Sequence, residues 1–191
     1  MSSDATSRLE PHEIARLRGG PRAAVTVAVL DLHLRGAAAA GRPGTMRSAG
    51  PATGQPLAPL AKAVHAALHR PAGLRQLLDR PVVRRALTDL RGELGAAGLL
   101  RAFPPGRTRA GRRTLRTLRA EHPLPADGSG LSTRDKLLAV ALYGDRALTG
   151  LVPRFAREAG LVGRGGSTEW DLPQSWSGGG GGGGGAGCGT A

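Results

Sequence analysis

Residues 9–36, LEPHEIARLRGGPRAAVTVAVLDLHLRG, decide the fold class because they predict two helices separated by a glycine turn. A proline opens each helix, where a missing backbone N–H is tolerated, and Gly19 and Gly20 supply residues that adopt positive φ after a helix end. The second helix places one apolar stripe at helical spacing before it ends at Gly36: Val25, Ala28, Val29 and Leu32. The stretch therefore indicates a helix-turn-helix and contains no catalytic residue set.

Residues 57–100 repeat this layout. A first apolar stripe is followed by a short helix near residues 73–78, and Pro81 then opens a longer helix that ends near Gly98. The stripes consist of Leu57, Leu60, Ala61, Val64 and Leu68, then of Val83, Leu87, Leu90 and Leu94. We therefore expect an all-α protein with two tandem helix-turn-helix or winged-helix-like units, at residues 9–36 and 57–100.

Three further segments complete the predicted organisation of a helical domain at residues 9–160. Residues 37–56 are rich in Gly, Pro, Ala, Ser and Thr, which is typical of a mobile linker or a degenerate wing. Thr108, and Ser132 with Asp135, predict the caps of a C-terminal helical pair within residues 108–160. We expect disorder at residues 1–8 and 161–191, since the tail includes eight glycines at residues 178–185.

The charge of the chain is strongly positive, at +13, and 25 arginines but only 2 lysines carry it. Part of this excess is what codon bias in a GC-rich genome produces, but a surplus of this size also favours contact with polyanions. Seven arginines and no acid lie between residues 101 and 120: Arg101, Arg107, Arg109, Arg112, Arg113, Arg116 and Arg119. The predicted helix turns most of them to one face and Leu115 and Leu118 to the other, so this face is either an anion-binding surface or a solvated helix face.

Signatures of catalysis and of metal or cofactor binding are missing from the sequence. It contains no nucleophile elbow, P-loop, dinucleotide-binding loop or HExxH, so we expect a protein that is not an enzyme and holds no cofactor. His65 and His69 have the spacing of a metal-binding pair but no further ligand nearby, and we interpret them as solvated histidines.

The tail contains three residues with chemistry of their own. Cys188 is the only cysteine and lacks a lipidation motif, so we expect a free thiol. Trp170 and Trp176 are either aromatic anchors or parts of a loose linker. The chain shows neither a signal peptide nor an apolar run that could span a bilayer, which predicts a cytoplasmic protein, with docking at a membrane left open.

Several sequence blocks of this chain, taken in order, resemble those of a protein family. LEPHEIARLRGGPRAAVTVAVLDLHLRG, LRGELGAAGLL, TRAGRRTLRTLRAEHPL, VALYGDRAL and the glycine-rich tail with its cysteine are similar to uncharacterised actinobacterial proteins that join a helical domain to a Gly/Cys-rich C-terminus, many of them described as membrane proteins. The resemblance covers residues 9–160 and the tail, and it implies no activity. In layout the chain also resembles the Golgi phosphoprotein 3-like helical proteins, which bind acidic phosphoinositide headgroups.

Three functions follow as hypotheses: a scaffold that binds an unidentified protein, a peripheral binder of anionic membrane, and a DNA-binding regulator. A DNA reader needs a recognition helix with outward basic residues. In the first unit we expect an outward face of mixed charge, formed by Arg22, Thr26, Asp31, His33 and Arg35. The second unit offers Arg84, Arg85, Thr88 and Arg91, diluted by Asp89 and Glu93. Nucleic acid is therefore the alternative partner, and the sequence leaves the oligomeric state open.

Overall fold

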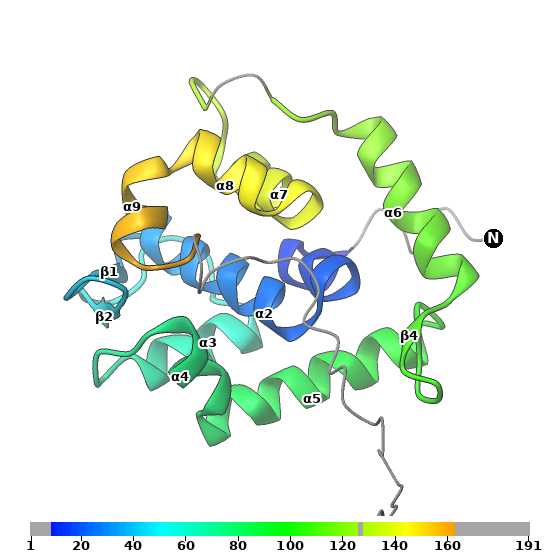
Figure 1. Ribbon diagram of the computed structural model, residues 1–191, viewed down its shortest axis with the longest axis horizontal. Helices are drawn as coiled ribbons and strands as arrows, with labels where there is room; N and C mark the ends of the chain where they lie inside the picture. The colour runs from blue at the N-terminus through cyan, green and yellow to red at the C-terminus, as the bar shows by residue number, and fades with distance from the viewer. Residues whose placement is uncertain (1–8, 126–127, 163–191) are drawn as a thin grey trace, which may run out of the picture.

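The computed structural model describes residues 9–125 and 128–162, which form a mainly helical protein built around one central helix (Figure 1). This helix, α2 (Pro11–Leu34), contacts α7, α3, α4, α5, α6 and β1. Gly19 and Gly20 have non-helical backbone angles inside it, and φ of Gly20 is +75°. The predicted glycine break is therefore confirmed, and it divides α2 into two helical halves.

The second half of α2 is buried on every side, because all ten positions from Ala23 to Leu32 lie in the core. A helix that is apolar all round belongs in the interior, whereas a single stripe would leave one face in water. Our prediction of an outward face was wrong for Thr26 and Asp31, which are 1% and 8% exposed. The predicted stripe residues are buried, but so are their neighbours.

The other elements surround this helix. They are β1 (Ala38–Ala40), β2 (Met46–Ser48), α3 (Pro59–Ala67), α4 (Leu74–Asp79), α5 (Pro81–Ala96), β3 (Leu100–Arg101), β4 (Gly106–Arg107), α6 (Arg109–Glu121), α7 (Thr133–Tyr143), α8 (Asp145–Leu151) and α9 (Pro153–Glu158). In Figure 1, α7 and α8 lie on one side of α2 and α3 and α5 on the other, while α6 follows the edge of the molecule. The mainly helical fold class is thus confirmed, but residues 108–160 contain four helices, α6 to α9, rather than the predicted pair.

Two small antiparallel hairpins interrupt the helices. Strands β1 and β2 pair with Ala38 opposite Ser48, and β3 and β4 pair with Leu100 opposite Arg107. The first hairpin occupies the segment that composition assigned to a linker or degenerate wing. Its Ala38 and Met46 are buried, and Met46 also bridges to Ala72. Composition alone missed these contacts, because a few small apolar residues suffice to join a hairpin to an existing core.

The predicted helix ends agree with the structure. Thr108 accepts a hydrogen bond from the Gly111 N–H at the start of α6, and Ser132 accepts one from the Asp135 N–H at the start of α7. Gly98 and Gly160 have φ of +71° and +64° just after α5 and α9, in the left-handed conformation that stops a helix. Cys188, Trp170 and Trp176 lie outside the described residues, as do residues 1–8 and 163–191 of the two segments predicted to be disordered. For the first two residues of the predicted tail the prediction was wrong, because Leu161 is fully buried and Val162 packs against the core.

Candidate anion-binding edge

The seven predicted arginines gather on β3, β4 and α6, and we call this set the basic edge. The hairpin of β3 and β4 continues directly into α6, and the hairpin and this helix lie together along the right side of the molecule in Figure 1. Four arginines of α6 are exposed at its outer face, at positions 109, 112, 113 and 116. On the opposite face Leu115 and Leu118 are 3% and 5% exposed, so the predicted division of this helix is confirmed.

A small residue and a threonine hold α6 against the base of the β3–β4 hairpin. The Thr108 hydroxyl donates to the Gly98 and Leu99 carbonyls at 2.7 and 3.2 Å, while it caps α6. Gly111 is buried here, and a Cβ at this position would clash with the Leu99 carbonyl oxygen. The hairpin and the arginine helix therefore form one fixed unit rather than two independent segments.

The remaining arginines of the basic edge differ in their surroundings. Arg101 is exposed on β3, while Arg107 is only partly exposed on β4. Arg119 stands at the margin of the arginine face and donates from Nε and Nη2 to the Leu142 carbonyl, at 3.3 and 3.1 Å. Arg119 thus also joins α6 to α7, a contact that sequence spacing could not reveal.

Electrostatic repulsion is present within the basic edge. Burial lowers the pKa of the Arg107 guanidinium from its ordinary value, and the nearby Arg119 and Arg112 lower this pKa further. The guanidinium still stays charged at neutral pH, because an arginine does not lose its proton under such conditions. Guanidinium groups such as the exposed ones of α6 donate charge-assisted hydrogen bonds to phosphate and carboxylate oxygens. The basic edge is therefore a candidate anion-binding site.

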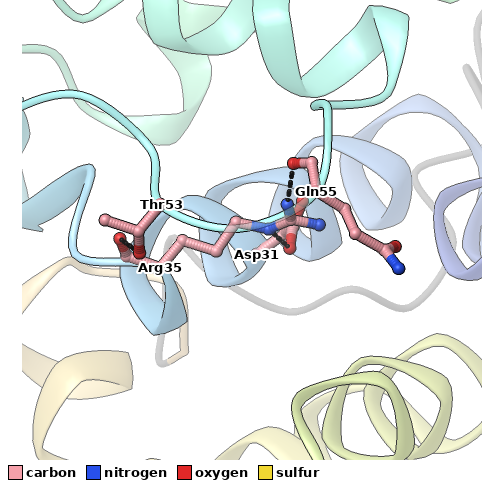
Figure 2. A network of polar contacts seen from close by, with 4 residues as sticks. All are labelled: Asp31, Arg35, Thr53 and Gln55. Atoms are coloured by element: carbon pink, nitrogen blue, oxygen red, sulfur yellow. Dashed lines mark hydrogen bonds and ion pairs between the residues drawn. The ribbon is translucent and has the colours of Figure 1, made fainter.

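A second polar region, which the sequence did not predict, lies where α2 ends (Figure 2). The Arg35 Nε donates to the Asp31 carboxylate at 2.6 Å, and its Nη1 donates to the Gln55 carbonyl at 2.5 Å. The Thr53 hydroxyl donates in turn to the Arg35 carbonyl at 3.1 Å. These bonds fix the segment between β2 and α3 to the central helix, so the role of this network is structural.

This segment also walls a cavity of about 630 Å³ between α2, α3, α5 and the start of α7. Four carboxylates line it, those of Glu10, Glu13, Asp31 and Glu93, together with His12, two arginines at positions 35 and 134, and apolar side chains. Burial lowers the pKa of His12 from 6.5, although Glu13, Glu10, Glu93 and Asp31 all act in the opposite direction. The lining of this cavity is thus of mixed charge, with four carboxylates against two arginines.

The two predicted solvated histidines each have a local partner. The Nε2 of His65 lies 2.9 Å from the Gly50 carbonyl oxygen, and the Nδ1 of His69 lies 2.8 Å from that of Ala66. His65 is partly buried rather than fully solvated, because residues 48–50 lie against it. Within residues 9–125 and 128–162, no group of three or more His, Cys, Asp or Glu side chains is arranged to hold a metal ion.

No family model, curated protein or solved structure matches the chain. The resemblance to the actinobacterial proteins and to the Golgi phosphoprotein 3-like layout therefore stays a prediction. None of the described helices is both long enough and apolar enough to cross a bilayer.

Proposed function

We propose that this protein is a non-enzymatic module that binds anionic membrane surfaces through the basic edge. The observation that carries the proposal is the outer face of α6, where four exposed arginines stand together and no acid occurs between residues 101 and 120. Each basic residue near an anionic bilayer contributes on the order of 1 kcal/mol of binding free energy. Guanidinium groups suit this task because they grip phosphate in a bidentate way.

The arrangement of charges supports an oriented encounter. The elements of the basic edge lie on one side of the molecule, whereas four carboxylates, accompanied by two arginines, line the cavity beside α2. An anionic surface therefore attracts the α6 side of the protein most strongly, and this attraction weakens as salt screens it.

DNA binding is the second candidate, and one observation favours it. Helices α3, α4 and α5 are followed by the β3–β4 hairpin, which is the element order of a winged-helix unit with its recognition helix and wing. Arg84, Arg85 and Thr88 are exposed on α5, but Asp89 and Glu93 are exposed on the same helix. The first of the two tandem units we proposed from sequence offers no comparable helix, since the second half of α2 is buried.

Vesicle flotation of charge-reversal variants tests the proposal. Replacing Arg109, Arg112, Arg113 and Arg116 by Glu should reduce binding to vesicles of equal parts phosphatidylcholine and phosphatidylglycerol by about a thousandfold or more, at about 1 kcal/mol per arginine. The fold should persist, because the buried face of α6 is unchanged. Circular dichroism and the thermal midpoint of each variant check this.

The matched control reverses four exposed arginines elsewhere, at positions 42, 47, 70 and 75. This variant has the same net charge as the α6 variant, so a loss confined to the α6 variant assigns binding to the basic edge. Equal losses in both would reduce the effect to net charge and contradict the proposed site. A third variant, Arg84→Glu with Arg85→Glu, should leave vesicle binding nearly intact and would abolish DNA binding if α5 were a recognition helix.

A further inference from the structure

The tip of the β3–β4 hairpin carries the most exposed large apolar side chain of the described residues. Phe103 is 90% exposed, and the next such residue is Val82 at 45%. Phenylalanine is normally buried, since its side chain contributes much of the apolar area of a core. The solvent exposure of this ring at a hairpin tip therefore suggests that another molecule supplies an apolar environment for it.

The hairpin presents this ring from a firm base. The Arg91 Nη2 donates to the Ala102 carbonyl at 3.3 Å, which joins the tip to α5. The backbone N–H of Thr108 donates to the Leu99 carbonyl at 3.1 Å, where the hairpin meets α6. The exposure of Phe103 is thus a property of the folded hairpin and not of a loose terminus.

The backbone next to Phe103 also suits a water-poor surrounding. Pro104 and Pro105 follow it and lack backbone N–H groups, so the tip presents fewer donors that would lose water on leaving the solvent. Arg101 and Arg107 stand on the two strands directly behind the tip. The hairpin therefore combines an apolar side chain at its tip with positive charges on its strands. This combination binds at the boundary between lipid headgroups and acyl chains.

We propose that Phe103 inserts into the headgroup–acyl boundary of an anionic bilayer while the basic edge holds the headgroups. This inference rests on the proposed function and adds an apolar anchor to it. Phenylalanine is among the apolar side chains, with Trp and Leu, that surface-bound proteins bury about 5–10 Å deep at this boundary. Insertion distinguishes a bilayer from other polyanions, because a phosphate surface without acyl chains gives the ring nothing apolar to enter.

A tryptophan reporter tests the insertion. In the full chain with Trp170→Phe and Trp176→Phe, Phe103→Trp places the only indole at the hairpin tip. On addition of phosphatidylcholine–phosphatidylglycerol vesicles its emission should shift to the blue, and brominated acyl chains should quench it. The matched reporter Val82→Trp, in the same background, should show neither change because it lies at the far end of α5.

The outcomes separate this inference from the proposed function. Flotation with vesicles but no shift and no quenching at position 103 would overturn the insertion and leave binding by the basic edge standing. Absence of flotation in the unsubstituted protein at low salt would overturn both. A blue shift with duplex DNA and none with vesicles would assign the ring to nucleic acid and also overturn the insertion.

Substitution of the ring gives an independent measurement. Phe103→Ala should weaken vesicle binding about tenfold, which is the effect of removing part of one buried aromatic side chain. Its salt dependence should match that of the unsubstituted protein, because no charge is removed. Phe103→Leu should keep most of the affinity. An unchanged affinity in Phe103→Ala, with the flotation of the unsubstituted protein intact, would contradict the anchor.

Discussion

The second half of α2 and the helix α6 are two helices of the same chain that meet opposite environments. In α2 all ten positions from Ala23 to Leu32 are buried, whereas in α6 a buried arc of Leu115 and Leu118 opposes a face of exposed arginines. The second half of α2 therefore contributes to the hydrophobic core on all sides, whereas α6 contributes to the core with one face and to the surface with the other. Substitutions in α2 should therefore change stability, and those on the arginine face should change binding alone.

The largest effect should come from a cavity in the centre. Leu30→Ala removes a fully buried side chain of α2 and should lower the free energy of unfolding by about 3 kcal/mol. Arg113→Ala, on the exposed face of α6, should change it by less than about 0.5 kcal/mol. Urea titration measures both. Similar losses in the two variants would break the comparison between core helix and surface helix.

The next largest effect on stability should come from the packing of α6 against the base of the β3–β4 hairpin. Gly111→Ala forces a Cβ against the Leu99 carbonyl and the Leu17 side chain, and it should cost about 2 kcal/mol of unfolding free energy. Gly92→Ala in α5 is the control, because a Cβ there meets nothing within 4 Å; it should stabilise the protein by up to about 1 kcal/mol. A stable Gly111→Ala variant would show that α6 does not pack closely on the hairpin base.

A comparison of ion pairs sharpens the same contrast. Asp31→Ala removes a buried carboxylate and leaves the Arg35 guanidinium only its hydrogen bond to the Gln55 carbonyl, so we expect a loss of about 1.5 kcal/mol. Glu158→Ala removes the partner of the exposed Arg154 and should change stability by less than about 0.5 kcal/mol. Thermal unfolding of the two variants measures both changes in stability. Equal midpoints would contradict the inference that the Asp31 network holds residues 53–55 against α2.

The smallest effect is the pH dependence that His12 brings. Burial lowers its pKa, with Glu13, Glu10, Glu93 and Asp31 opposing the shift, so the folded protein binds this proton less tightly than the unfolded chain does. The unfolding free energy should therefore fall as the pH drops below about 6.5, by less than about 1 kcal/mol in total. His12→Asn should remove this part of the slope, while the exposed His69→Asn should keep it. An identical slope in all three proteins would contradict the assignment.

Local signals in the sequence predicted most of the helices. The caps at Thr108 and Ser132 and the breaks at Gly20 and Gly98 depend on neighbouring residues alone, so they could be recognised without the fold. The arginine face of α6 was predictable for the same reason, since its pattern lies within one helix.

Features that depend on tertiary contacts were not predictable. The burial of Thr26 and Asp31 depends on the helices that surround α2, and their polarity alone suggested a solvent-facing side. Both short hairpins were missing from the prediction, because strands of two or three residues carry no periodic pattern. Phe103 was missed as well, although an aromatic residue beside two prolines and among arginines is a signal that the sequence contains.

The most direct test of the central claim compares two polyanions under one condition. The full chain is titrated at the same low salt with vesicles of equal parts phosphatidylcholine and phosphatidylglycerol, followed by flotation, and with duplex DNA, followed by a mobility shift. The basic edge with its apolar tip predicts binding to the vesicles that is stronger than binding to DNA, is lost on pure phosphatidylcholine and weakens as salt rises. Tighter binding to DNA, or no flotation with the anionic vesicles, would contradict it.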